Sequence, residues 1–305
     1  MSPVAGPLAS SPMPPNALQG GEFRSLTPTK DQRPRGRWSQ PQLAMIARQL
    51  TERDRQVLQA VSRFRVMSGA QLQRLFWAEG SPQTRARLAR RGLARLVHLE
   101  VLQPLARRVG GARAGSASTT YAAGRAGQYL LREGQPSKRR VRRAYTPGER
   151  YLAHSLAVAQ LYVELTDAHR SGLVELAEFA PEPDCWRIYT VAFGARQVLK
   201  PDAYVKLATA EYEFSWFIEI DMATEATTTI RVKAERYHEY YRSATEQTAR
   251  GVFPRVLWIV PDGARAETIA DTLTGLPAEA QRLFALTTSN QAVALLASEA
   301  TRDPA

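Results

Sequence analysis

The feature that most constrains the fold is a pair of strand-like runs, residues 203–207 and 212–220, within PDAYVKLATAEYEFSWFIEID. Runs rich in β-branched and aromatic residues on either side of a short polar break predict a β-hairpin. With the turn at residues 210–211, the numbers of opposing residues sum to 421, so Asp202 lies opposite Glu219. The predicted register therefore gathers acidic residues at one end of the hairpin.

Three carboxylates are predicted to converge at that end. Side chains alternate between the two faces of a strand, so Glu219 and Asp221 share a face, and Asp202 joins them across the hairpin. Neighbouring carboxylates disfavour joint ionisation, and a divalent cation such as Mg²⁺ or Mn²⁺ would relieve the repulsion. In the alternative, Asp202 ends a strand while the other two are solvated edge charges. The spacing alone leaves both interpretations open.

Basic residues are concentrated in the first half of the chain. Residues 1–150 carry 27 Lys and Arg against 8 Asp and Glu, residues 151–305 carry 14 against 21, and together they give the net charge of +12. Such asymmetry favours a nucleic-acid-binding front half and a chemically different back half. The alternative is a generally basic chain in which arginine replaces lysine, but the clustering favours the nucleic-acid interpretation.

Composition excludes several other classes of protein. Hydrophobic residues make up 44% and charged residues 23% of the 305 residues, which is typical of a globular protein with room for two cores. No apolar run approaches the roughly 18 residues of a membrane span, and the N-terminus lacks a basic-then-apolar signal pattern. The single Cys185 excludes an intramolecular disulfide. We therefore expect a cytoplasmic protein that does not contact membranes.

The segment after Thr51 predicts three helices followed by a β-hairpin. Thr51, Ser68 and Ser81 are good N-caps, and a helical pattern of apolar residues follows each of them. Two strand-like pieces around a Gly/Arg/Ser loop come next, and residues 125–131 indicate a closing helix. This is the order of a winged helix-turn-helix, whose third helix enters the major groove of DNA. Winged helices also bind proteins, so that alternative stays open.

Candidate DNA contacts lie on the predicted third helix, on the wing and on a basic linker. For any single arginine a solvated helix face is the simpler interpretation, whereas the group as a whole favours contact with DNA. The linker carries a run of five charges that stays extended and would track phosphates. These residues are Arg85, Arg87, Arg90 and Arg91 on the helix, Arg107, Arg108 and Arg113 on the wing, and Lys138, Arg139, Arg140, Arg142 and Arg143 in the linker.

The second half of the chain predicts an α/β domain with helices on the faces of a sheet. Its expected elements are a helix over 148–171, strands over 173–179 and 188–193, the hairpin, a helix over 225–243 capped by Thr224, a strand over 255–261, a helix over 265–273 and a strand over 283–287. The chain then divides into a disordered tail 1–45, a winged-helix domain 46–131, a basic linker 132–147, an α/β domain 148–292 and a tail 293–305.

This order of elements, with its two acidic positions, resembles the PD-(D/E)xK nuclease superfamily and its restriction-endonuclease-like fold. The resemblance implies that Asp202 and Glu219 hold a catalytic divalent metal. The superfamily's lysine, two residues after the glutamate, is replaced here by Asp221. Lys233 lies on the following helix and can point towards the same sheet end, where it would position water or stabilise the phosphate. The alternative for Lys233 is an ordinary solvated lysine.

A narrower resemblance covers roughly residues 50–290. The winged helix, the basic linker and the blocks ERYLAHSLAVAQLYVEL, PDAYVKL, FIEIDMATEATTTIRVKAERYHEYYRS and RVLWIVPD are similar to the replication-relaxation family of plasmids and integrative elements. The resemblance implies DNA binding linked to plasmid replication, relaxation or conjugative transfer. It also implies a histidine, His154, on the long helix; a lone histidine on a helix is more often structural, and both alternatives stay open.

Three functions are compatible with these residues. The first is a DNA-binding accessory protein of a mobile genetic element, whose nuclease-like domain does not cut. The second is a Mg²⁺-dependent endonuclease or nickase that uses Asp202, Glu219, Asp221 and Lys233. The third is a transcriptional regulator with a decayed nuclease domain. Expected partners are double-stranded DNA, a relaxase or replication initiator, and a second copy of the chain; without a GxxxxGK[ST] motif, no nucleotide cofactor is expected.

Overall fold

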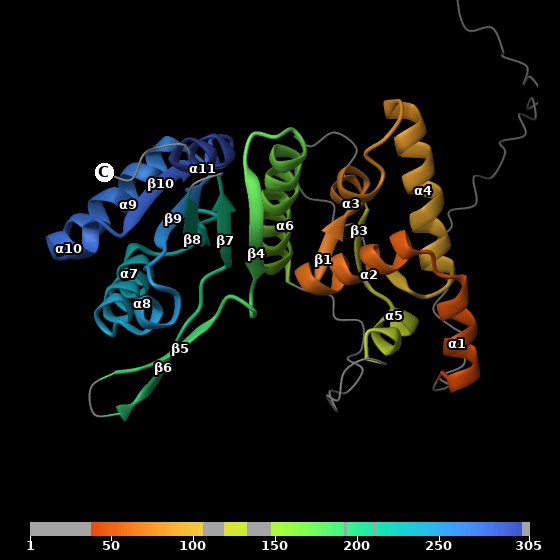
Figure 1. Ribbon diagram of the computed structural model, residues 1–305, viewed down its shortest axis with the longest axis horizontal. Coiled ribbons are helices and arrows are strands. Elements are labelled where there is room, and N and C mark those ends of the chain that lie inside the picture. Colours follow the sequence, from red (N-terminus) through yellow and green to blue (C-terminus); the bar gives the residue numbers. More distant parts are fainter. Residues whose placement is uncertain (1–37, 106–118, 133–147, 192–193, 210–211, 301–305) are drawn as a thin grey trace, which may run out of the picture. The chain divides into compact units, whose positions relative to one another are not determined.

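The computed structural model describes residues 38–105, 119–132, 148–191, 194–209 and 212–300. All of these residues belong to one compact unit, a mixed α/β fold with helices and three sheets (Figure 1). Among the helices described, none combines the length and the apolarity that crossing a membrane requires.

The first part of the described chain is a helical unit closed by a small antiparallel sheet of order β1-β3-β2. Thr51, Ser68 and Ser81 cap α2, α3 and α4, because each hydroxyl accepts a backbone N–H three residues later. These three N-caps confirm the predicted helix starts. The elements are α1 Gln40–Gln49, α2 Glu52–Phe64, β1 Val66–Ser68, α3 Gly69–Phe76, α4 Pro82–His98, β2 Leu102–Pro104, β3 Thr120–Ala123 and α5 Arg125–Leu130.

The second part is built on a five-stranded sheet of order β10-β9-β8-β7-β4. Strands β4, β7 and β8 are antiparallel neighbours, whereas β9 and β10 run parallel to β8. A separate β5–β6 hairpin extends from between β4 and β7 (Figure 1). The elements are α6 Glu149–Arg170, β4 Glu175–Pro181, β5 Arg187–Thr190, β6 Arg196–Leu199, β7 Ala203–Ala208, β8 Glu213–Ile220, α7 Thr227–Arg242, α8 Thr245–Arg250, β9 Arg255–Val260, α9 Gly263–Thr274, α10 Ala278–Gln281, β10 Phe284–Thr288 and α11 Ala292–Ala300.

The predicted hairpin register is confirmed. Tyr204 pairs with Phe217 and Lys206 pairs with Ser215, so opposing residue numbers sum to 421. The predicted turn at residues 210–211 lies outside the described residues. Alternation along the strands gives the sheet two apolar faces, with Val205 packed in the core that contains α6 and Tyr204 in the core that contains α7.

The helical unit packs directly on α6, and the two parts of the chain share one apolar core. Polar contacts reinforce this packing: the Gln71 side chain donates a hydrogen bond to the carbonyl of Leu156 at 2.8 Å, and Arg74 contacts Asp167 at 2.7 Å. Arg170 donates to the carbonyl of Leu75 at 2.6 Å. The unit that carries α4 is therefore anchored to the same helix that borders the sheet.

Some elements differ from those that the sequence predicts. Helix α7 begins at Thr227 with Ala226 as its N-cap, so Thr224 does not cap it. Helix α1 lies partly within the expected N-terminal tail because Ser39 and Gln42 form a capping box. Helix α11 occupies most of the expected C-terminal tail because Leu296 is fully buried in the core beside α6. Strand β6 and the short helices α8 and α10 carry signals too brief to predict.

Candidate functional site

A buried carboxylate, Glu219, stands near the end of β8 in contact with α7. Its Oε2 lies 3.0 Å from the Nζ of Lys233, and its Oε1 accepts a hydrogen bond from the Tyr237 hydroxyl at 2.7 Å. Lys233 and Tyr237 are four residues apart on α7, so their side chains lie on one face of that helix. Lys233 also contacts Glu225 at 3.1 Å. The helix spacing thus brings Lys233 to the sheet end, beside Glu219.

Asp202 closes the same end of the hairpin. Its Oδ2 accepts the backbone N–H of Ile220 at 2.7 Å, and its own N–H donates to the carbonyl of Ile218 at 3.0 Å. On the other side, the same Oδ2 lies 3.0 Å from Nε2 of His154, which α6 supplies. His154 therefore does reach the acidic residues. We call Asp202, Glu219, Lys233, Tyr237 and His154 the hairpin-end cluster.

The buried position of Glu219 and the nearby charge of Asp202 both oppose the ionisation of Glu219. Burial, together with the negative charge of Asp202, raises the pKa of Glu219 to about 7, and the Lys233 ammonium only partly offsets this rise. Burial lowers the pKa of His154, but its hydrogen bond and attraction to Asp202 outweigh that effect and leave the pKa above its ordinary value. A carboxylate with a shifted pKa beside a basic residue occurs both in functional sites and in structural ion pairs.

Asp221 does not join the cluster, so the predicted convergence of three carboxylates is wrong. Its buried side chain forms a two-point ion pair with Arg265, whose Nε lies 2.5 Å from Oδ2 and whose Nη2 lies 3.0 Å from Oδ1. Oδ2 also accepts the backbone N–H of Ala223 at 3.0 Å. Asp221 follows the last residue of β8, and α9 presents Arg265 there from 44 positions further along the chain.

Asp202 and Glu219 are the carboxylates of the predicted metal site that stay together at the end of the hairpin. Within the part of the chain that the structure describes, no group of three or more His, Cys, Asp and Glu side chains is arranged to hold a metal ion. Asp202 and Glu219 are oxygen donors of the kind that suits Mg²⁺, which often takes only one or two carboxylates. In the structure, Lys233 rather than a third acid accompanies Glu219.

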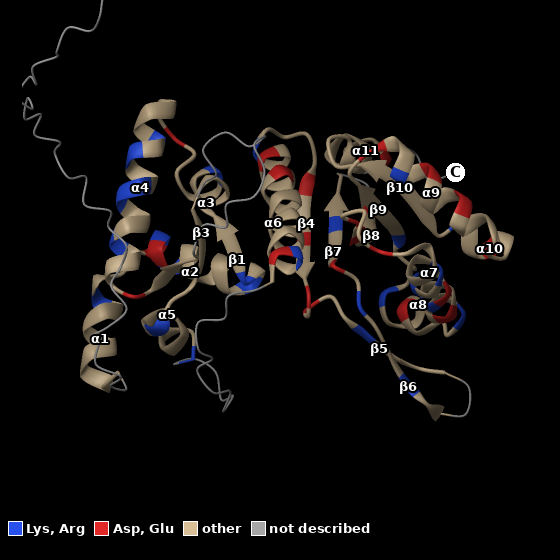
Figure 2. Ribbon diagram, turned by 180° about the vertical axis from the view of Figure 1, so that it is seen from behind, with Lys and Arg blue, Asp and Glu red and all other residues tan. Residues whose placement is uncertain are grey.

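The predicted DNA contacts fall into three groups. Arg87, Arg90 and Arg91 are exposed on α4, and basic residues run along this helix (Figure 2). Arg85 is half-buried and donates to the carbonyl of Ala78 at 3.2 Å, so it braces the start of α4. The wing and linker candidates lie outside the described residues; they are Arg107, Arg108, Arg113, Lys138, Arg139, Arg140, Arg142 and Arg143.

One further arginine of α4, Arg95, has a structural partner. Its guanidinium is paired with the carboxylate of Asp54, which is 2% exposed, and donates to the carbonyl of Gln49 at 3.1 Å. Burial pushes the pKa of Asp54 up, but hydrogen bonds from Thr51 and Arg95 outweigh it and hold the pKa below its ordinary value. Arg95 therefore holds α4 against α2.

We predict that Arg95→Ala destabilises the fold while Arg87→Ala does not. Removing Arg95 leaves the Asp54 carboxylate with only its Thr51 bonds, and breaking a partly buried pair should cost about 2 kcal/mol after discounting for the exposed side of the arginine. Arg87 is exposed, so its removal should change the unfolding free energy by less than about 0.5 kcal/mol. Urea denaturation measures both, and equal midpoints would contradict the assignment.

The fold and the site define the class of this protein: a mixed α/β protein in which a basic helical unit is packed on a sheet domain with a buried Glu–Lys pair at its hairpin end. The model of the replication-relaxation family matches residues 58–256, which contain α4 and the whole hairpin-end cluster. The chain belongs to the replication-relaxation family. Membership associates it with the replication and relaxation of mobile genetic elements. The search of curated proteins and the search of solved structures each gave no match.

Proposed function

We propose that this chain is a DNA-binding accessory protein of a mobile genetic element, which holds duplex DNA through α4 and does not cut it. The main support for this proposal is that Arg87, Arg90 and Arg91 are exposed together on one face of α4. Helix α4 is 17 residues long, enough to span a major groove. Arginines arranged in this way neutralise phosphates and read guanine edges.

The element order around α4 supports a winged-helix interpretation. The order α2, β1, α3, α4, β2, β3 and the antiparallel sheet β1-β3-β2 are those of a winged helix-turn-helix, with α4 as its third helix. In that interpretation the segment between β2 and β3 is the wing. The anchoring of α3 on α6 through Gln71 and Arg74 would hold the bound DNA in a fixed relation to the sheet domain.

The sheet domain supports a nuclease-like interpretation. A long helix, an antiparallel meander, a helix and a further parallel strand occur in this order as α6, β4, β7, β8, α7 and β9, with the β5–β6 hairpin inserted after β4 and the short α8 inserted after α7. Glu219, however, already contacts Lys233 and accepts a hydrogen bond from Tyr237, and Asp221 is paired with Arg265. Because side chains of the protein itself already occupy these carboxylates, the arrangement favours DNA binding over DNA cutting.

The second candidate is a metal-dependent endonuclease or nickase, which the shifted pKa of Glu219 beside Asp202 favours. Asp202 and Glu219 would hold the cation, and Lys233 would orient water or stabilise the charged phosphate. Bound Mg²⁺ supplies Lewis acidity at a phosphoryl oxygen. His154 would hold Asp202 in place through its 3.0 Å contact. A transcriptional regulator that uses α4 alone is the remaining alternative.

A nicking assay on supercoiled DNA with Mg²⁺ or Mn²⁺ separates these candidates. We expect stable binding and no conversion to nicked circles by the wild-type protein. Nicking that Asp202→Ala and Glu219→Ala both abolish would overturn the non-cutting proposal. The Lys206→Ala variant serves as a control because Lys206 forms an ion pair with the exposed Glu213, away from the hairpin-end cluster. Calorimetry with Mg²⁺ then asks whether the cluster takes up the cation.

A further inference from the structure

Arg65 stands in a backbone conformation that its side chain disfavours. It follows the last residue of α2 with φ 66° and ψ −41°, a positive-φ conformation in which glycine is the favoured residue. Strained positions of this kind persist where the surrounding structure or the function requires a particular side chain. The guanidinium of Arg65 is exposed, and it makes no side-chain hydrogen bond or ion pair with the residues that the structure describes.

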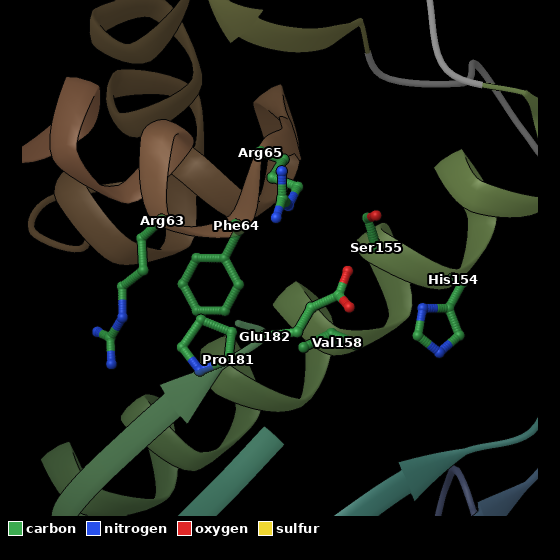
Figure 3. Close-up of a pocket in the computed structure, with 8 residues that line it drawn as sticks. All are labelled: Arg63, Phe64, Arg65, His154, Ser155, Val158, Pro181 and Glu182. Atoms are coloured by element: carbon green, nitrogen blue, oxygen red, sulfur yellow. The ribbon is translucent and has the colours of Figure 1, made fainter. Parts of the chain in front are cut away.

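A pocket lies beside this arginine, between the end of α2 and the start of the sheet domain. Figure 3 shows Arg63, Phe64 and Arg65 on the side of α2, with His154 on the far side of the pocket and the Glu182 carboxylate between them. The pocket borders the hairpin-end cluster, because His154 contacts Asp202 and the N–H of Glu182 donates to the Asp202 carbonyl at 3.0 Å. Its lining is Arg63, Phe64, Arg65, His154, Ser155, Val158, Pro181 and Glu182.

Arg63 is the second cation at the rim of this pocket. Its guanidinium carbon lies 5.7 Å from the ring centre of Phe64 and 5.5 Å from that of Tyr162, so the two rings fix its direction while its donors stay exposed. Within the described residues, Arg63 makes no ion pair either. Arg63 and Arg65 thus lie on one rim without a carboxylate partner among the described residues, and guanidinium groups are the donors best suited to phosphate.

We propose that Arg63 and Arg65 bind the phosphate backbone of a DNA strand at the mouth of this pocket, next to the hairpin-end cluster. The Glu182 carboxylate would repel a phosphate from the floor, so the phosphate sits on the arginine rim. The strand is thereby held beside Asp202 and His154. This inference rests on the proposed DNA-binding function and adds to it a second contact that is independent of α4.

Arg65→Gly tests the inference because it removes the guanidinium and relieves the backbone at the same position. Glycine adopts positive φ without strain, so the melting temperature should stay the same or rise. The affinity for a fluorescent 40-base-pair duplex should fall about threefold to tenfold. The slope of log affinity against log salt should become shallower by about one, the change expected when one phosphate contact is lost. Adding Arg63→Gln should weaken binding further, while the exposed Arg282→Gln serves as a control and should change nothing.

A loss of affinity without a loss of stability is the result that a merely structural arginine would not produce. Unchanged affinity and salt slope in Arg65→Gly and in the double variant would overturn the inference, and so would a lowered melting temperature together with unchanged binding. These outcomes leave the proposed function standing if Arg87 and Arg91 variants still lose affinity. Absence of duplex binding by the wild-type protein would instead remove the proposed function, and this inference with it.

Discussion

Replacing Arg87 and Arg91 together with glutamate is expected to weaken duplex DNA binding on the order of a hundredfold or more. Both side chains are exposed one helical turn apart on α4, so reversal removes two cationic contacts and adds two charges that phosphates repel. Fluorescence anisotropy with a labelled duplex at fixed salt measures the loss. Because neither residue is buried, the melting temperature should stay close to that of the wild-type protein.

The matched control is the reversal of Arg242 and Arg282, which are also exposed but belong to α7 and to the end of α10. This control changes the net charge by the same amount, so it separates a local contact on α4 from a general electrostatic attraction. A comparable loss in both double variants would mean that total charge, and not the α4 face, governs binding. Wild-type affinity in the Arg87/Arg91 variant would reject α4 as the recognition helix.

Replacing Lys233 with methionine is expected to lower the free energy of unfolding by about 3 kcal/mol at pH 8 in a buffer with chelator. Lys233 faces the buried carboxylate of Glu219, and its loss leaves that charge with the Tyr237 hydroxyl as its remaining side-chain partner among the described residues. Chemical denaturation gives the value. The control is Lys206→Met, whose partner Glu213 is exposed and whose loss should cost under about 1 kcal/mol.

The stability difference between the wild-type protein and the Lys233→Met variant should depend on pH. The pKa of Glu219 is raised from 4.5 to about 7 on folding, so its contribution to stability is complete below about pH 4.5 and is lost as the pH rises through 7. The methionine variant should therefore approach the wild-type stability at pH 5, where Glu219 holds a proton, with a difference of about 1 kcal/mol. A difference that stays constant from pH 5 to pH 8 would contradict a charged Glu219–Lys233 pair.

Features encoded in short stretches of sequence were predictable. The caps Thr51, Ser68 and Ser81 satisfy backbone donors three residues away, and the hairpin register follows from alternation and loop length. Lys233 could be placed because helix periodicity relates it to its neighbours on α7. All of these signals act within a few turns of helix or across one hairpin.

Partners that are distant in sequence were not predictable. Arg265 reaches Asp221 from 44 residues away and removes it from the acidic cluster, and Asp54 engages Arg95 from 41 residues away. Neither pair has a local pattern, because an ion pair between distant residues depends on how separate elements pack. The positive φ of Arg65 also carries no sequence signal, since glycine or asparagine is the residue that normally marks such a position.

The most direct test of duplex binding through phosphate contacts is a titration of the wild-type protein with a labelled duplex at several salt concentrations. Log affinity should fall linearly with log salt, with a slope of about −3 or steeper, because the three exposed arginines of α4 alone would each displace a counterion. Absence of binding at low salt, or an affinity that does not depend on salt, would contradict the account.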